Sequence, residues 1–510
     1  MALLLVSSIL LPLLGVWYLY KSTRPKASHV PLVEFEEGDN SPARYETDTV
    51  TVLLGKGYKE YTKKDLPFRI QNPFDPKQPL IVLPFKYLDE VKWAPTSRFS
   101  FYDFIDKLGS MTQLGIPLLS HEGAMSARIG LNKALGSKIA LMQEACVGTF
   151  EKLMPDCTDW TEVAMPYIVI MQVFANMSAW VFVGEEIGSR ESEWQKLTLG
   201  YVHKVNATLD KVRARYPASL LWLAKYLDSD VKSMAKDRQV AGELLREPLE
   251  ARLAASKDQL KSERGSRHFE DGVQWLADIY MDKGETLTPD MVQQKLVTLV
   301  FASIHSTSSA ALTILLDLIA HPEAAEEIRQ EVDRVRSANS GPWTRQTLGE
   351  LRLLDSFMRE SARFHAFAQV LSLQRIAQVP WTFSDGFSIP AGATIAFLGY
   401  HQGHDPDFHP DPETFDPKRH LRKREAYDGD SQHFRFTSVT DDLLHFGSGV
   451  HACPGRFFAQ ESLKLIMVHL LTNYDFKVAE KDEKVPKMVV RNLVLKANMA
   501  LPVLFKERKA

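Results

Sequence analysis

The chain has 510 residues, of which 45% are hydrophobic and 25% are charged, so it can bury a large core. Its formal net charge of −3 at pH 7 includes no basic excess, which argues against nucleic acid as a partner. Only three cysteines occur, Cys146, Cys157 and Cys453, so the fold does not rest on a disulfide framework and suits a reducing compartment.

The first segment with a clear pattern is residues 2–20, which carry no charge and consist mostly of aliphatic and aromatic residues. This is about the length that an α-helix needs to cross a bilayer core. A cleaved secretory signal is the alternative, but no basic segment precedes the run, and Trp17, Tyr18 and Tyr20 stand where small residues would mark a cleavage site. These aromatic residues are typical of a membrane interface, so we predict a membrane anchor.

Basic residues follow the apolar run directly, at Lys21, Arg24 and Lys26. By the positive-inside rule, their charge places the rest of the chain on the cytosolic side of the membrane. The prolines that come next indicate a stiff hinge. We therefore predict three parts: a transmembrane anchor at 1–20, a proline-containing hinge at 21–48 and one domain at 49–510.

Beyond the hinge, short β-like runs at 50–54 and 80–84 flank a helix predicted at 57–65. The long stretch 139–264 has apolar residues at three- and four-residue spacing and few breakers, which predicts helices. The tail from Val478 alternates in places and predicts a final hairpin. The chain is thus predicted to be mainly α, with a small β-rich region.

A helix of about 30 residues is predicted at 289–321, capped at Thr288 or Asp290 and ended by a proline. Its middle has the sequence Ala-Ser-Ile-His-Ser-Thr at 302–307, where hydroxyl groups can divert helix hydrogen bonds. The imidazole of His305 can relay a proton near neutral pH, although a histidine in such a helix is more often a satisfied core residue.

Further along, Glu360 and Arg363 are three residues apart, which places a carboxylate and a guanidinium on one helical face. By itself the pair is a weak signal, because similar pairs occur on many surface helices. Its meaning depends on the rest of the chain.

The segment 446–455, Phe-Gly-Ser-Gly-Val-His-Ala-Cys-Pro-Gly, indicates a glycine-rich loop that holds one cysteine sulfur in a fixed position. The amides at the start of a predicted apolar helix, 457–471, would favour the Cys453 thiolate. An anionic sulfur in a stiff loop is a metal ligand or a nucleophile. A nucleophile needs a base, and His451, two residues away on the same loop, points elsewhere more easily, so we favour the ligand.

Six positions of this loop match the haem-binding signature of the cytochrome P450 family: Phe446, Gly447, Gly449, His451, Cys453 and Gly455. The resemblance implies the P450 fold, a large helical domain with a small β-rich lobe. It also implies a haem b whose iron takes the Cys453 thiolate as axial ligand. The family usually carries an acid at the position of His305. With histidine there, the chain resembles fungal microsomal P450 monooxygenases of secondary metabolism.

The resemblance also implies basic partners for the two haem carboxylates, which would be costly to bury uncompensated. Arg375 and His451 match family positions that bind a propionate. Arg128 matches a further one, although Ala124 stands where the family carries a tryptophan.

The family's Glu-x-x-Arg pair matches Glu360 and Arg363, and its partner segment matches 411–419. The resemblance therefore implies a structural triad of these two residues with Arg419, which fixes the segment that leads to the Cys453 loop.

On the long helix, Ser303 replaces the family's usual glycine and Ser306 its usual first threonine. The resemblance implies that Thr307, Ser306 and His305 deliver protons there, in a helix that is locally opened.

The function implied by the resemblance is that of a monooxygenase, which inserts one oxygen atom of O2 into an apolar small-molecule substrate such as a terpenoid or another secondary metabolite. No flavin or nicotinamide glycine fingerprint occurs in the sequence, so electrons would come from a separate NADPH–cytochrome P450 reductase docking near Arg456 and Lys464. The anchor would place the enzyme in the endoplasmic reticulum membrane, with its catalytic domain in the cytosol.

Two alternatives stay open. The altered residues Ser303, His305 and Ser306 are compatible with a reductase-independent isomerase, dehydratase or peroxygenase on the same fold. A non-catalytic haem sensor or carrier belongs to a different class, and the retained Thr307 argues against it.

Overall fold

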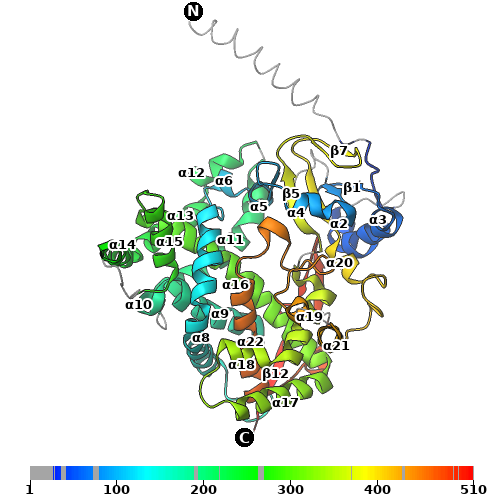
Figure 1. Cartoon of the computed structure of the whole chain (residues 1–510). Coiled ribbons are helices and arrows are strands. Elements are labelled where there is room, and N and C mark those ends of the chain that lie inside the picture. The colour runs from blue at the N-terminus through cyan, green and yellow to red at the C-terminus, as the bar shows by residue number, and fades with distance from the viewer. Residues whose placement is uncertain are drawn as a thin grey trace, which may run out of the picture. The chain divides into compact units, whose positions relative to one another are not determined.

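The structure is a computed structural model of the whole chain (Figure 1). It describes residues 27, 29–35, 42–72, 80–188, 193–217, 219–261, 269–368, 370–427, 431–485, 487–491 and 493–508. Residue contacts divide the chain into two compact units: Met1–Lys107 with Leu373–Leu398, and Leu108–Ser372 with Gly399–Ala510. The predicted anchor at 2–20 and much of the predicted hinge lie outside the described residues, so both stay predictions.

The first unit contains most of the strands. Its five-stranded sheet has the order β1-β2-β8-β5-β3, with β2 and β8 parallel and a short β6–β7 hairpin beside it in sequence. The three residues of β2 are fully buried, which confirms the strand predicted at 80–84. The strands are β1 (Phe68–Ile70), β2 (Leu80–Val82), β3 (Phe99–Ser100), β5 (Ser372–Ala377), β6 (Trp381–Thr382), β7 (Ser388–Ile389) and β8 (Thr394–Phe397).

Four helices accompany this sheet in sequence: α2 (Pro42–Asp48), α3 (Leu54–Glu60), α4 (Leu88–Lys92) and α5 (Phe101–Gly109). The strand predicted at 50–54 is wrong, because Thr49–Leu53 forms a π-helical turn that runs into α3. Val50, Leu53 and Leu54 are buried at three- and four-residue spacing, whereas Val52 is exposed. Burial of one helical face thus outweighs the strand preference of these β-branched residues.

The second unit is helical and bears out the prediction for 139–264, which is interrupted only by β4 (Thr161–Val163) among the described strands. Its first helices are α6 (Met111–Leu114), α7 (His121–Met125), α8 (Asn132–Leu153), α9 (Pro166–Phe182), α10 (Gly184–Gly188), α11 (Glu193–Arg215), α12 (Ala224–Leu227), α13 (Ser229–Leu244), α14 (Arg246–Lys261) and α15 (Gly272–Asp282). The later ones are α16 (Pro289–Ala320), α17 (Pro322–Ala338), α18 (Arg345–Glu350), α19 (Arg352–His365), α20 (Gly399–Gly403), α21 (Arg419–Ala426) and α22 (Arg456–Asn473). The predicted mainly α fold with a small β-rich lobe is confirmed.

The long helix predicted in the middle of the chain is α16, which has 32 residues and packs against α9, α13, α11 and α22 (Figure 1). The Thr288 hydroxyl caps it by accepting a hydrogen bond from the Met291 amide at 3.3 Å, and Pro289 occupies its first turn. Among the described residues, α16 is the one helix long and apolar enough to cross a membrane, but it is largely buried in the protein. It is therefore the core helix of the second unit.

The C-terminal strands form two small sheets in the second unit. The predicted final hairpin is present as β10 (Met488–Arg491) paired with β11 (Val494–Ala497). The last strand, β12 (Val503–Glu507), lies between β4 and β9 (Tyr474–Lys477) in an antiparallel sheet.

Candidate functional site

The loop that carries Cys453 is held in shape by glycine conformation and a backbone hydrogen bond. Gly447 and Gly449 have φ angles of 67° and 66°, in the left-handed region that favours glycine. The Cys453 amide donates to the Phe446 carbonyl at 2.8 Å and closes the loop. The loop then runs into α22 immediately after the cysteine, as the sequence predicts.

Side chains from outside the loop fix its carbonyl groups. The Arg128 guanidinium donates to the Val450 carbonyl at 2.9 Å, and the Arg456 guanidinium donates to the Cys453 carbonyl at 3.0 Å. Arg128 is exposed, so this bond leaves part of its guanidinium open to other partners. The structure thus brings Arg128 to the cysteine loop.

Burial works against the thiolate that the sequence predicts. It raises the pKa of the Cys453 thiol, and the Gly455 amide and the Arg456 charge lower that pKa only in part. The amides before α22 act in the predicted direction, because the Gly455 amide lowers this pKa, but desolvation is the larger effect. A bound metal ion reverses this balance, since a coordinating thiol loses its proton outright.

Gly455 in the second unit and Arg375 in the first unit each have a feature that packing within the protein does not explain. A Cβ at Gly455 would meet no other protein atom within 4 Å, so packing within the chain does not require glycine there. Arg375 is buried, donates to the Gln374 carbonyl at 2.7 Å and lies over the Phe101 ring. Burial lowers the pKa of Arg375 to about 10, and no ion pair joins it to a carboxylate of the residues that the structure describes. A buried guanidinium of this kind calls for an anionic partner.

Phe446 and His451, which are also predicted to contact the haem, lie in the cysteine loop itself. Phe446 packs edge-on against Phe436, with ring centroids 5.1 Å apart. His451 ends a short 3₁₀ turn, Gly449–His451, and is half-buried two residues before the cysteine.

The middle of α16 presents one exposed strip. Ala302 and Ser306, four residues apart on one face, are exposed, whereas Thr307 is only 6% exposed. The Ser306 hydroxyl donates to the Ala302 carbonyl at 2.8 Å. The structure therefore separates the two hydroxyls that the sequence places together.

The local opening implied for this helix is not seen, since α16 is α-helical throughout 302–307. Ser303 stands at the position of the usual glycine, and serine costs a helix less than glycine does. Its hydroxyl donates to the Val300 carbonyl at 3.0 Å, and the helix nevertheless keeps its α-helical form here.

His305 is half-buried and contacts a tyrosine that sequence reasoning missed. Its Nδ1 lies 2.8 Å from the Tyr167 hydroxyl, and the two rings meet edge-on. Burial and the charge of Lys496 lower the pKa of His305, so the ring is neutral at neutral pH.

The Glu360, Arg363 and Arg419 side chains meet in the second unit as the resemblance implies. Arg363 donates two hydrogen bonds to the Glu360 carboxylate, at 2.7 and 2.9 Å, and Arg419 Nε donates to the same group at 3.1 Å. His420 Nε2 lies 3.3 Å from it. Burial opposes the charge of Glu360, but the bonds from Arg363 and the nearness of His420 hold its pKa well below the usual range.

The arginines of this triad also bind the segment before the cysteine loop. Arg363 Nη1 donates to the Gly403 carbonyl at 2.6 Å and to the Pro412 carbonyl at 2.8 Å. Arg419 donates to the Pro410 and Thr414 carbonyls. These bonds tie irregular backbone to α19.

Two further charged residues of α19 also bind distant segments of the chain. Sequence reasoning did not predict this role. Arg359 is fully buried and donates to the Arg435 carbonyl at 2.6 Å and to the Thr440 hydroxyl at 2.8 Å. Asp355 accepts from the Phe436 amide at 2.9 Å and pairs with Lys464 at 3.0 Å. The suggested role of Lys464 in reductase docking is therefore wrong, because its side chain is buried and paired with Asp355.

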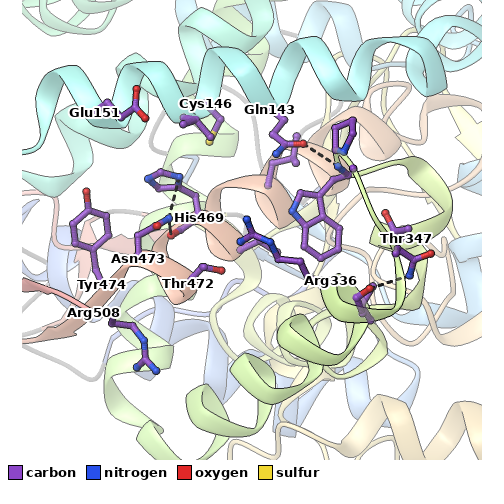
Figure 2. Close-up of a pocket in the computed structure, with 18 of the residues that line it drawn as sticks. Gln143, Cys146, Glu151, Arg336, Thr347, His469, Thr472, Asn473, Tyr474 and Arg508 are labelled. Carbon is purple, nitrogen blue, oxygen red and sulfur yellow. Dashed lines mark hydrogen bonds between the residues drawn. The ribbon is translucent and has the colours of Figure 1, made fainter. Parts of the chain in front are cut away.

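A cavity of about 410 Å³ lies elsewhere in the second unit, among α8, the end of α17 and the end of α22 (Figure 2). Arg336, His469 and Tyr474 line it, and the Gln143 side chain accepts a hydrogen bond from the Trp343 amide at its edge. None of the predicted site residues that the structure describes lines this cavity. It is therefore distinct from the cysteine loop.

The chain is similar to known proteins over most of its length. A family model described as Cytochrome P450 matches residues 118–501. The chain is 36% identical to Cytochrome P450 monooxygenase cheE of Chaetomium globosum over 465 residues, which cover 91% of this chain and 88% of that protein. It is 34% identical to Pyrichalasin C-7 hydroxylase of Pyricularia grisea over 457 residues, which cover 89% and 87% of the two chains.

A solved structure, that of retinoic acid-bound cyanobacterial CYP120A1, matches 95% of this chain and 100% of that one with a TM-score of 0.66. The two sequences are only 19% identical, so this likeness concerns the fold alone.

Proposed function

Because the chain belongs to the cytochrome P450 family, we propose that it is a membrane-bound monooxygenase acting on a sizeable apolar secondary metabolite. The family and the fold imply a haem with a cysteine thiolate ligand, and its chemistry when bound is to activate O2, with the thiolate favouring O–O cleavage. The observation that carries the proposal is the glycine-shaped loop that presents the Cys453 sulfur beside α22. Haem b is the expected type, since the sequence has no Cys-x-x-Cys-His motif for covalent attachment.

The residues around the haem would divide three tasks. Cys453 would ligate the iron, while Phe446 shields the loop through its contact with Phe436. Arg375 and His451 would bind the haem carboxylates, a role that the buried charge of Arg375 supports, since no described carboxylate forms an ion pair with it. Arg128 would fix the loop through the Val450 carbonyl.

Proton delivery would fall to Ser306 before Thr307. The Ser306 hydroxyl lies on the exposed strip of α16, and its bond to the Ala302 carbonyl orients it. Thr307 is buried behind this strip. We assign Thr307 a packing role and Ser306 the proton-donating one.

The substrate class rests on the relatives. One of them is named as a C-7 hydroxylase, which supports hydroxylation of a C–H bond as the reaction of this chain as well. We propose a terpenoid or polyketide scaffold as substrate, and a separate NADPH–cytochrome P450 reductase as the electron donor. Arg128, which contacts the cysteine loop, and Lys133, five residues further along, are both exposed and would attract an acidic surface of that reductase.

The test is product analysis with isotopically labelled oxygen. Membranes containing the protein and its reductase are expected to convert a suitable scaffold to a product with one atom from 18O2, with NADPH consumed. A product formed without NADPH and O2 would favour an isomerase or dehydratase, and one formed only with hydrogen peroxide would favour a peroxygenase. Haem binding without any product from a broad panel would favour a sensor or carrier.

Membrane contact beyond the predicted anchor is supported by one exposed apolar segment. Leu220, Trp222, Tyr226 and Leu227 are all 45% exposed or more, within eight residues of chain around α12. Such a concentration of large apolar side chains indicates a membrane or protein contact. We propose that this segment enters the endoplasmic reticulum membrane from its cytosolic side.

We expect an environment-sensitive dye attached at Trp222→Cys to emit at shorter wavelength when the protein is in a lipid nanodisc than when it is in detergent-free buffer after anchor removal. The matched control is Trp160→Cys, which is 39% exposed on the same unit. Equal emission shifts at the two positions would contradict insertion of this segment.

A further inference from the structure

The contact between Tyr167 and His305 joins two helices at the site proposed for proton delivery. Tyr167 lies in the first turn of α9 and is buried, and its hydroxyl is 2.8 Å from Nδ1 of His305 on α16. The rings are nearly perpendicular, with an interplanar angle of 82°. The phenol therefore meets the edge of the imidazole through its hydroxyl.

The protonation states of the two groups set the direction of this hydrogen bond. Burial raises the pKa of Tyr167 to about 12, so the phenol keeps its proton. Burial also lowers the pKa of His305, with a further contribution from Lys496 on β11, so the imidazole is neutral. A neutral imidazole has one acceptor and one donor nitrogen, and a phenol O–H is the stronger donor of the pair. Where the phenol donates, Nδ1 accepts and Nε2 carries the ring proton.

We infer that Tyr167 is a positioning residue that holds His305 in its Nε2–H tautomer, so that His305 acts as a fixed hydrogen-bond donor and not as a proton relay. This inference rests on the proposed function. Nε2–H is then available to a water molecule or to a substrate oxygen. The relay role that the sequence suggests for His305 falls to Ser306 and water.

The physical reason is the proton balance of a relay. For His305 to pass a proton on, Nε2 would release its proton while Nδ1 takes one from Tyr167. That step leaves a phenolate inside the protein, where burial disfavours its charge. The other route, through an imidazolium, is disfavoured by the burial of His305. Both routes are uphill at neutral pH.

The tautomer can be measured without turnover. Full-length protein labelled with 15N-histidine is compared with Tyr167→Phe, and His305→Gln assigns the His305 signals. We expect long-range proton–nitrogen spectra of the wild type to show an unprotonated Nδ1, with His305 mainly neutral from pH 6.5 to about 8.5 because burial lowers its pKa from 6.5. In Tyr167→Phe we expect both tautomers. Tyr201→Phe removes another buried hydroxyl, on α11, and is expected to leave His305 unchanged.

The same variants are then compared in turnover. We expect Tyr167→Phe to lose coupling several-fold, measured as product formed per NADPH consumed, with the difference released as hydrogen peroxide, while KM changes little. The wild-type coupling should show no break in that pH range. Thermal melts report whether each variant folds, and the wild-type spectra decide the tautomer even where a variant does not.

Two results would overturn the inference: a protonated Nδ1 in the wild type, or a His305 that titrates in the measured pH range together with the coupling. Tyr167→Phe with wild-type tautomer and coupling would do the same. Failure of the proposed function is a separate outcome, in which the wild type forms no product but its histidine spectra can still be interpreted.

Discussion

Cys453→Ser abolishes the long-wavelength absorption band that the dithionite-reduced, carbon monoxide-treated protein is expected to show, together with product formation. A hydroxyl in place of the sulfur leaves no thiolate for the iron, and the electron density that favours O–O cleavage is lost. The variant should still fold, because the loop is closed by the backbone bond from residue 453 to the Phe446 carbonyl. Absorption spectra and product assays on the same membranes measure both effects.

Cys157→Ser is the matched control. Cys157 is fully buried and its thiol contacts the Pro155 carbonyl at 3.2 Å, a bond that a serine hydroxyl can also make. This variant should keep the band and the activity. If Cys453→Ser kept the thiolate band, the assignment of the sulfur ligand would be wrong.

Arg375→Met tests the haem carboxylate contact in the same spectra. We expect the thiolate band to survive, because the sulfur is unchanged, while haem is released faster. The haem-free protein should become more stable, since the substitution removes a buried charge that forms no ion pair with a carboxylate among the described residues.

Glu360→Ala is expected to lower the free energy of unfolding by about 3–5 kcal/mol, the cost typical of breaking a buried charge pair. Its removal leaves the buried guanidinium groups of Arg363 and Arg419 without their carboxylate. Since a folded domain is stable by only about 5–15 kcal/mol, much of this variant should fail to fold and to take up haem at growth temperature. Urea unfolding and haem content measure the effect.

An exposed ion pair supplies the control. Glu327 pairs with Lys418, and both side chains are nearly half exposed. Glu327→Ala should therefore change the unfolding free energy by only about 0–1 kcal/mol. Equal effects of the two substitutions would refute the structural role of Glu360.

The charge of Glu360 also makes stability depend on pH. Its folded-state pKa lies well below its ordinary value of 4.5, because hydrogen bonds from Arg363 and the nearby His420 outweigh the effect of burial. A group with a depressed folded pKa contributes stability above its unfolded pKa and loses that contribution as the pH falls through the folded value. The wild type should therefore lose stability below about pH 4.5, and Glu360→Gln should lose less over the same range.

Predictions from the sequence were most accurate where a local motif determines the geometry of the backbone or of a side-chain pair. The cysteine loop needs glycine at 447 and 449 because of their backbone angles, and the spacing of Glu360 and Arg363 follows from the helix itself. Arg419 was predicted from the family resemblance, since it lies 59 residues beyond its partner Glu360.

Sequence reasoning failed where burial determines the role of a residue, because no local sequence pattern indicates that burial. Lys464 and Arg359 are charged residues, which are usually exposed, yet both are buried against backbone carbonyls of distant segments. Tyr167 meets His305 across 138 residues, and only the packing of α9 on α16 brings them together. The burial that raises the pKa of the Cys453 thiol was missed for the same reason, since desolvation cannot be read from the loop sequence.

The charged face of α19 has a consequence for how the chain is made. Its carboxylates and guanidinium groups bind partners as far along the chain as Lys464, so they stay unsatisfied until that stretch has left the ribosome. At about 5–20 residues per second, translation alone keeps the nascent second unit incomplete for several seconds. The cysteine belongs to the same late-made stretch, so haem capture is expected to be a post-translational step, made on a chain whose earlier helices already exist.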